Sequence, residues 1–143
     1  MPDEAQKVTA KQKQREASKR ATLDLMKNKP RATSEFSIFI KDEDGETQEL
    51  TLKFQAIGAR NYDKLVAKHP PKPEQRAEGA SFNMDTFAPA LIAAVSVDPE
   101  ISVEDANEIW SSEDWSRGDL MVLFRNAVEL NNRGIDIPFS ENG

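Results

Sequence analysis

Apolar and polar residues alternate in two stretches near the start of the chain. Between the two stretches lies the turn-forming sequence Asp42-Glu43-Asp44-Gly45. A period of two places every second side chain on the same face of a β-strand. The two stretches are therefore predicted to form a β-hairpin with one apolar face. The residues expected on that face are Phe36, Ile38, Ile40, Leu50, Leu52 and Phe54.

The spacing of apolar residues becomes helical after the hairpin. Residues 59–69 place Tyr62, Leu65 and Val66 on one side of a short helix, which the following prolines must end. Residues 70–81 combine prolines, charges and a glycine. This composition predicts a surface loop.

The most apolar stretch, residues 82–97, predicts the central helix of the fold. Asp85 or Thr86 is expected to be its N-cap. Pro89 then falls in or just beyond the first turn, where a missing amide costs little. The side chains expected to face the core are Phe87, Leu91, Ala94 and Val95.

Two further helices are predicted from their start signals. Ser102 is followed three residues later by Asp105, the pattern of a capping box that opens a short helix to Trp110. Ser116 is expected to cap a longer helix that Gly134 stops. The core-facing residues of this longer helix are expected to be Leu120, Leu123, Phe124, Ala127 and Val128.

The first 33 residues are rich in good helix formers but contain few apolar positions. They are predicted to form a basic helical or disordered arm. The chain as a whole is predicted to be α+β: a basic N-terminal helix or mobile arm, a β-hairpin, and then a small bundle of three or four helices. The expected organisation is an arm over residues 1–33, one α+β domain over 34–139, and a tail over 140–143.

Charge is distributed unevenly along the chain. Through Arg31 there are nine Lys or Arg against four Asp or Glu, a net charge of +5. Because the whole chain has a net charge of −6, the remainder carries −11. Phosphate contacts need basic side chains gathered on one surface. The acidic domain is therefore a poor candidate for nucleic-acid binding, and only the arm could serve. The arm is interpreted either as a grip on an acidic partner or as a solvated tail.

The inventory of reactive side chains is small. The sequence has no cysteine and one histidine, His69. This composition excludes disulfides, thiolate ligands, a cysteine nucleophile and any two-histidine metal site. The glycine-rich phosphate loops and the nucleophile-elbow motif are absent from the sequence. We predict no catalytic residue, no cofactor and no metal, hence a non-enzymatic binding protein, although a carboxylate pair assembled from distant positions stays open.

The two tryptophans, Trp110 and Trp115, are the most informative large residues, and in a small domain with few aromatics a place in the core is favoured for them. Tryptophan combines a large apolar area with one polar group, and it serves equally in a core or at an interface. Met121 adds an adaptable apolar side chain. The candidate partner-binding residues are Phe87, Leu91, Trp110, Trp115, Leu120, Met121 and Phe124.

The order of these segments resembles a known family. The segments are the hairpin, a YxxLxxxHPP segment over 62–71, FNMDTFAPALIAAVSVDPEIS from Phe82, and WSRGDLMVLFRNAVELN from Trp115. In order and spacing they resemble the tail assembly chaperones of siphoviruses that infect actinobacteria, over residues 34–139. Two features depart from the family pattern: Val95 stands where many members have a cysteine, and the basic arm is longer than usual.

The resemblance implies a factor in the host cytoplasm that keeps the tape measure protein soluble during tail assembly and is absent from the mature virion. It also implies a longer frameshift product and the tail tube protein as further candidate partners. No stretch has the roughly 18 apolar residues of a membrane helix, so no membrane partner is expected. Two alternatives stay open: a structural tail or head-tail connector protein retained in the virion, and a regulator whose arm binds nucleic acid.

Overall fold

The computed structural model describes residues 19–132. The chain divides into two units, Met1–Pro30 and Arg31–Gly143. Within the first unit, α2 spans Leu23–Lys27 and begins at Thr22, whose Oγ1 accepts a hydrogen bond from the Leu25 amide at 3.3 Å. The expected stop at Gly134, the end of the domain at 133–139, the 140–143 tail and most of the arm lie outside the described residues.

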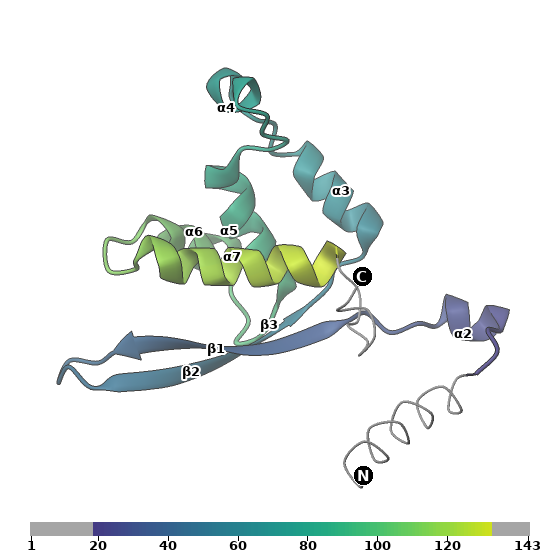
Figure 1. Ribbon diagram of the computed structural model, residues 1–143, viewed down its shortest axis with the longest axis horizontal. Coiled ribbons are helices and arrows are strands. Elements are labelled where there is room, and N and C mark those ends of the chain that lie inside the picture. The colour runs from purple at the N-terminus through teal and green to yellow at the C-terminus, as the bar shows by residue number, and fades with distance from the viewer. Residues whose placement is uncertain (1–18, 133–143) are drawn as a thin grey trace, which may run out of the picture. The chain divides into compact units, whose positions relative to one another are not determined.

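The second unit is built on an antiparallel hairpin, as the alternating pattern predicts (Figure 1). Strand β1 spans Thr33–Lys41 and β2 spans Thr47–Gln55. Phe36 lies opposite Leu52 and Ile38 opposite Leu50, so the expected apolar residues share one face. The core side chains of this face are Ile38, Leu52 and Phe54, all less than 9% exposed.

The hairpin turn is closed by its own backbone and by Asp42. The Gly45 amide donates to the Asp42 carbonyl, and Gly45 has a φ of 80°, the left-handed region that suits glycine. The Asp42 carboxylate accepts from the Glu46 amide at 2.9 Å, the Asp44 amide at 3.0 Å and the Gln48 side chain at 2.9 Å. The acidic turn is therefore an ordered structural cap of the hairpin.

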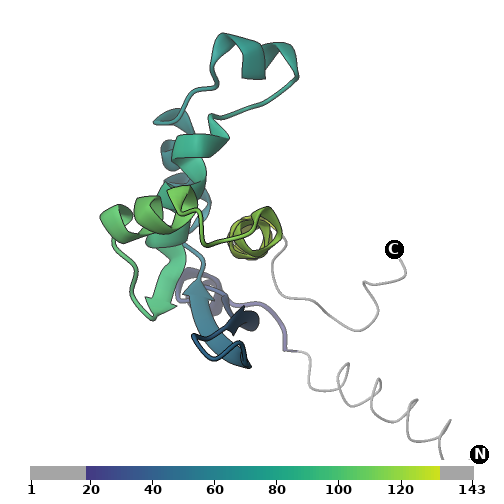
Figure 2. The same ribbon diagram turned by 90° about the vertical axis from the view of Figure 1, so that its left-hand side faces the viewer.

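The helices follow in chain order and lie on one side of the hairpin (Figures 1 and 2). The bounds are α3 Ala59–Ala67, α4 Pro73–Ala77, α5 Met84–Val95, α6 Val103–Ser111 and α7 Arg117–Asn132. The predicted α+β class, a hairpin followed by a small group of helices, is confirmed. Among the described helices, none is long and apolar enough to cross a membrane.

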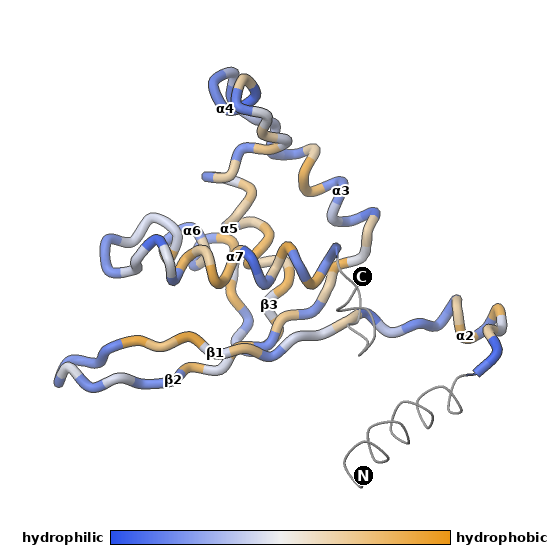
Figure 3. Tube along the Cα trace, viewed as in Figure 1, coloured by the Kyte–Doolittle hydropathy of each residue, from blue (hydrophilic) through white to orange (hydrophobic). Residues whose placement is uncertain are grey.

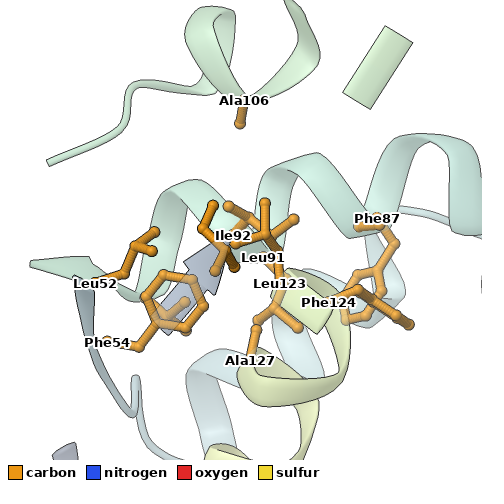
Figure 4. Close-up of a cluster of buried hydrophobic side chains, with 12 residues drawn as sticks. Leu52, Phe54, Phe87, Leu91, Ile92, Ala106, Leu123, Phe124 and Ala127 are labelled. Atoms are coloured by element: carbon orange, nitrogen blue, oxygen red, sulfur yellow. The ribbon is translucent and has the colours of Figure 1, made fainter. Parts of the chain in front are cut away.

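The core forms where α5, α6 and α7 meet the apolar face of the hairpin. Figure 4 shows side chains from the hairpin, α5 and α7 converging, with Ala106 approaching from α6. Phe54, Phe87, Leu91 and Val95 are fully covered. In Figure 3 the apolar colour runs along α5 and recurs at intervals along α7, consistent with a central helix and a helix with one buried side.

Two elements were not expected from the sequence. Residues 70–81 contain a one-turn helix, α4, as well as loop; Pro73 occupies its first position, and the Gln75 side chain accepts from the Lys72 amide at 2.8 Å. Strand β3, Ser96–Asp98, adds to β2 opposite β1 and makes a three-stranded sheet. Three residues are too few for a recognisable alternating pattern, so pairing with β2 alone defines the strand.

The start of α5 also differs from expectation. Its N-cap is Asn83, whose side-chain oxygen accepts from the Asp85 amide at 3.1 Å, so the helix begins before Asp85 and Thr86. Pro89 is consequently inside the helix as its sixth residue, in the second turn. Ala94 is exposed, contrary to prediction. The rings of Tyr62, Phe82 and Phe124 contact Phe87 in the N-terminal half of α5. Ala94 lies about two turns further along the helix, so these rings do not cover it.

Candidate functional site

Serine side chains fix the short connection between α6 and α7. The Ser102 cap of α6 is confirmed, because its Oγ accepts from the Asp105 amide at 3.0 Å. Ser112 Oγ accepts from the Asp114 amide at 3.1 Å, and Ser116 Oγ accepts from the Asp119 amide at 3.1 Å, so α7 begins where the sequence predicts. The bonds of Ser112 and Ser116 lie in the connection that carries Trp115, and they order its backbone.

This connection brings the two tryptophans into one surface groove of about 550 Å³. We call it the tryptophan groove. It lies between the end of α6, the first turn of α7 and the first turn of α5. Its lining residues are Asp85, Trp110, Ser111, Ser112, Trp115, Arg117 and Leu120. Trp110 and Trp115 are both partly exposed, so their apolar surfaces remain accessible to a partner.

The groove rests on an aromatic chain that leads into the core. The Trp110 ring meets the Phe124 ring edge-on, with centroids 6.2 Å apart. Phe124 in turn meets Phe87 at 6.1 Å, and Phe82 contacts both rings. Such edge-to-face pairs add to the free energy that area burial alone provides. The floor of the groove is therefore held by side chains that also stabilise the domain.

The structure divides the seven predicted partner-binding residues into three groups. Trp110, Trp115 and Leu120 line the tryptophan groove. Phe124, 8% exposed, belongs to the core, and Met121 packs against the core while it stays partly exposed. Phe87 and Leu91 are 0% exposed, so in this structure they support the groove from within and cannot touch a partner.

The groove also contains two charged residues that were not among the predicted partner-binding residues. Asp85 and Arg117 place opposite charges on its lining. Asp85 could be singled out from the sequence only as an acid near a helix start, where the helix dipole favours it. Arg117 has no sequence signal of its own, because its role depends on how α7 approaches α5. Together the charges can orient a partner that the tryptophans anchor.

The only histidine has a structural setting. His69 Nδ1 lies 2.9 Å from Thr86 Oγ1, and the His69 carbonyl accepts from the Asn83 amide at 2.8 Å. These contacts tie the end of α3 to the start of α5. Over residues 19–132, no group of three or more His, Asp or Glu side chains could hold a metal ion.

A second hollow, of about 360 Å³, lies between β3 and α6. Glu100, Asp105 and two serines line it together with Ala93 and Ile101. It has no aromatic side chain to anchor a partner. The tryptophan groove is therefore the better candidate for a binding site.

No protein-family model, curated protein or solved structure matches this chain.

Proposed function

We propose that this protein is a non-enzymatic tail assembly chaperone of a long-tailed bacteriophage, acting in the host cytoplasm, and that it binds the tape measure protein through the tryptophan groove. The observation that carries the proposal is the gathering of Trp110 and Trp115, the only tryptophans, in one accessible groove. The sequence resemblance over residues 34–139 supplies the identity of the partner. The acidic remainder of the chain supports solubility while an apolar client is held.

The groove suits an apolar anchor of a helical client. Interface energy concentrates in a few buried aromatic side chains, and tryptophan is the most enriched of these. A large side chain of the client can pack between Trp110 and Trp115, while Asp85 and Arg117 pair with polar groups beside it. Release at assembly requires only that the client exchange this surface for the polymerising tail tube.

Coexpression with the tape measure protein tests the proposal. The wild-type chain should keep the client in the soluble fraction and co-purify with it. Trp115→Ala should reduce co-purification about tenfold or more, the loss expected for an interface hot spot. Val103→Ala is the matched control, because Val103 is an apolar residue of α6 that is 54% exposed and lies outside the groove. Equal co-purification by wild type and Trp115→Ala, both folded, would refute the groove as the site.

A structural protein of the tail or of the head-tail connector is the second candidate function. The observation that favours it is the outer edge of β1, which pairs with no other strand among residues 19–132. Such an edge can join another sheet in a permanent assembly. Mass spectrometry of purified virions separates the two functions, because a chaperone should be absent from the particle and a structural protein present in fixed copy number.

A further inference from the structure

Over residues 19–132, no strand pairs with the outer edge of β1, and its outward backbone groups are open to a further strand. The Asp42 amide donates to the Glu46 carbonyl, and the Ala56 amide donates to the Ala32 carbonyl. At both ends of the β1–β2 ladder the hydrogen-bonded pair therefore includes an even-numbered residue on the β1 side. Bonded and non-bonded pairs alternate along an antiparallel ladder. The backbone groups of Glu35, Ser37, Phe39 and Lys41 therefore point away from β2.

The hairpin also exposes large apolar side chains, which protected sheet edges usually avoid. Phe39 is 61% exposed on the face opposite the helices, and Leu50 on β2 is 38% exposed near the hairpin tip. Glu35 and Lys41 are exposed at opposite ends of β1. An accessible edge that carries a large apolar side chain is a template for another strand.

We propose that the β1 edge pairs antiparallel with the β1 edge of a second copy, about a twofold axis at Ile38. In this register Glu35 lies opposite Lys41 of the other copy, and by symmetry the pair occurs twice. Phe36 lies opposite Ile40, and Ile38 opposite itself. The apolar faces of the two hairpins become one continuous face, and the two Phe39 side chains become diagonal neighbours.

Other registers fit the outward-pointing groups less well. Hydrogen bonding requires that outward residues pair with outward residues, so the twofold axis must pass through a residue rather than between two. The axes that keep most of β1 paired with its copy lie at Ser37, Ile38 or Phe39. An axis at Ser37 leaves Lys41 opposite Thr33 and Glu35 opposite Phe39. An axis at Phe39 leaves Lys41 opposite Ser37 and moves Glu35 beyond the end of β1, toward the acidic turn at Glu43. Only the axis at Ile38 matches opposite charges.

The free edge of β2 is a poorer site for a second copy. The C-terminal part of β2 is already paired, because Lys53 and Phe54 lie opposite β3. Its remaining outward groups belong to Thr47, Glu49 and Thr51, which include no positive charge. A twofold axis at Glu49 would place two acids opposite each other. Charge complementarity therefore selects β1.

Analytical ultracentrifugation of the full chain tests the proposal with a charge exchange. Lys41→Glu should raise the dimer dissociation constant about tenfold or more, because it replaces two attractive cross-strand pairs by two repulsive ones. Glu35→Lys should act similarly, although Glu35 also lies opposite Lys53 within the hairpin. Lys41 faces Thr47, so Lys41→Glu is the cleaner variant. Lys64→Glu, the same charge reversal at an exposed position of α3, is the matched control and should leave the dimer unchanged.

Mixing the two single variants gives the decisive result. Each variant alone places like charges at both ends of the paired strands, whereas a heterodimer of Glu35→Lys with Lys41→Glu restores opposite charges at both ends. The mixture should therefore dimerise with nearly wild-type affinity, which a folding defect could not produce. A wild-type chain that stays monomeric at high concentration would overturn the proposal and make the charges a protective feature of the edge. A dimer indifferent to all these changes would also overturn it, as would an edge that pairs only with the client.

Discussion

The cap of α5 provides a sharp test of how this domain is held together. Asn83 is 9% exposed, and its side-chain oxygen accepts from the Asp85 amide at 3.1 Å and from Gln75 Nε2 at 3.3 Å. The backbone amide of Asn83 donates to the His69 carbonyl at 2.8 Å. One side chain therefore starts the central helix and joins it to α4, while its backbone joins it to the end of α3.

Asn83→Ala should lower the free energy of unfolding by about 1–2 kcal/mol. Loss of an N-cap oxygen costs about 0.5–2 kcal/mol, and the Gln75 amide loses a partner in a half-buried position. The backbone bond to His69 survives the change. Asn83→Ser restores a cap oxygen but cannot reach Gln75 in the same way, so it should recover most of the loss.

Urea unfolding followed by tryptophan fluorescence measures these differences as shifts of the midpoint at constant slope. Asp85→Ala is the matched control, because Asp85 is exposed and contributes a first-turn charge worth about 0.3–1 kcal/mol. If Asn83→Ala costs less than Asp85→Ala, the helix starts later than Asn83 and the reasoning fails.

Three further predictions follow from the core, the turn and the arm. Leu91→Ala should cost about 2–5 kcal/mol, as should Phe124→Ala, and an unchanged unfolding midpoint would contradict their burial. The Asp42 pKa should lie below its ordinary 3.8, because the Glu46 amide, with lesser contributions from Gln48, Asp44 and Gly45, stabilises its carboxylate. A lowered folded-state pKa gives the turn stability that is present above pH 3.8 and is lost as pH falls through the folded value. An NMR titration midpoint at or above 3.8 would refute this. Limited trypsin treatment should remove residues 1 to about 25 first, since their apolar positions form no continuous stripe. An arm as resistant as the domain would contradict that prediction.

The features that the sequence predicts well are those that short-range chemistry decides. The hairpin follows from a period of two and an acidic turn with glycine, and the starts of α6 and α7 follow from Ser102 and Ser116. In each case the residues that carry the signal lie within a few positions of the structure they specify. No contact with a distant part of the chain is needed to place them.

The features that the sequence does not predict depend on distant contacts. Strand β3 exists because Ser96 and Asp98 meet β2, which is more than forty residues earlier. Asn83 and Asp85 are both good cap residues, and the contacts of Asn83 with Gln75 and His69 accompany the earlier start. Pro73 is a local signal that the loop prediction for residues 70–81 leaves out, because proline also suits the first position of a helix.

The candidate site shows the same division between local and distant information. Residue type alone makes Trp110 and Trp115 candidates for the binding site together with Phe87 and Leu91, since all four are apolar residues at or near predicted helices. Burial separates them: the latter two are 0% exposed and the tryptophans are not. The groove that they share also needs Asp85 of α5, which lies 25 or more residues earlier in the chain.

The two tryptophans differ in what their replacement would report. The Trp110 ring packs on Phe124, which continues to Phe87, so Trp110→Ala should lower stability together with partner binding. Among the described aromatic side chains, none makes a ring contact with Trp115. Trp115→Ala should therefore weaken binding with a smaller change in the unfolding midpoint than Trp110→Ala. Because binding of a client also stabilises the folded state, both midpoints must be measured on the free chain. If Trp115→Ala destabilises the free chain as much as Trp110→Ala does, its side chain belongs to the core and the groove loses its main anchor.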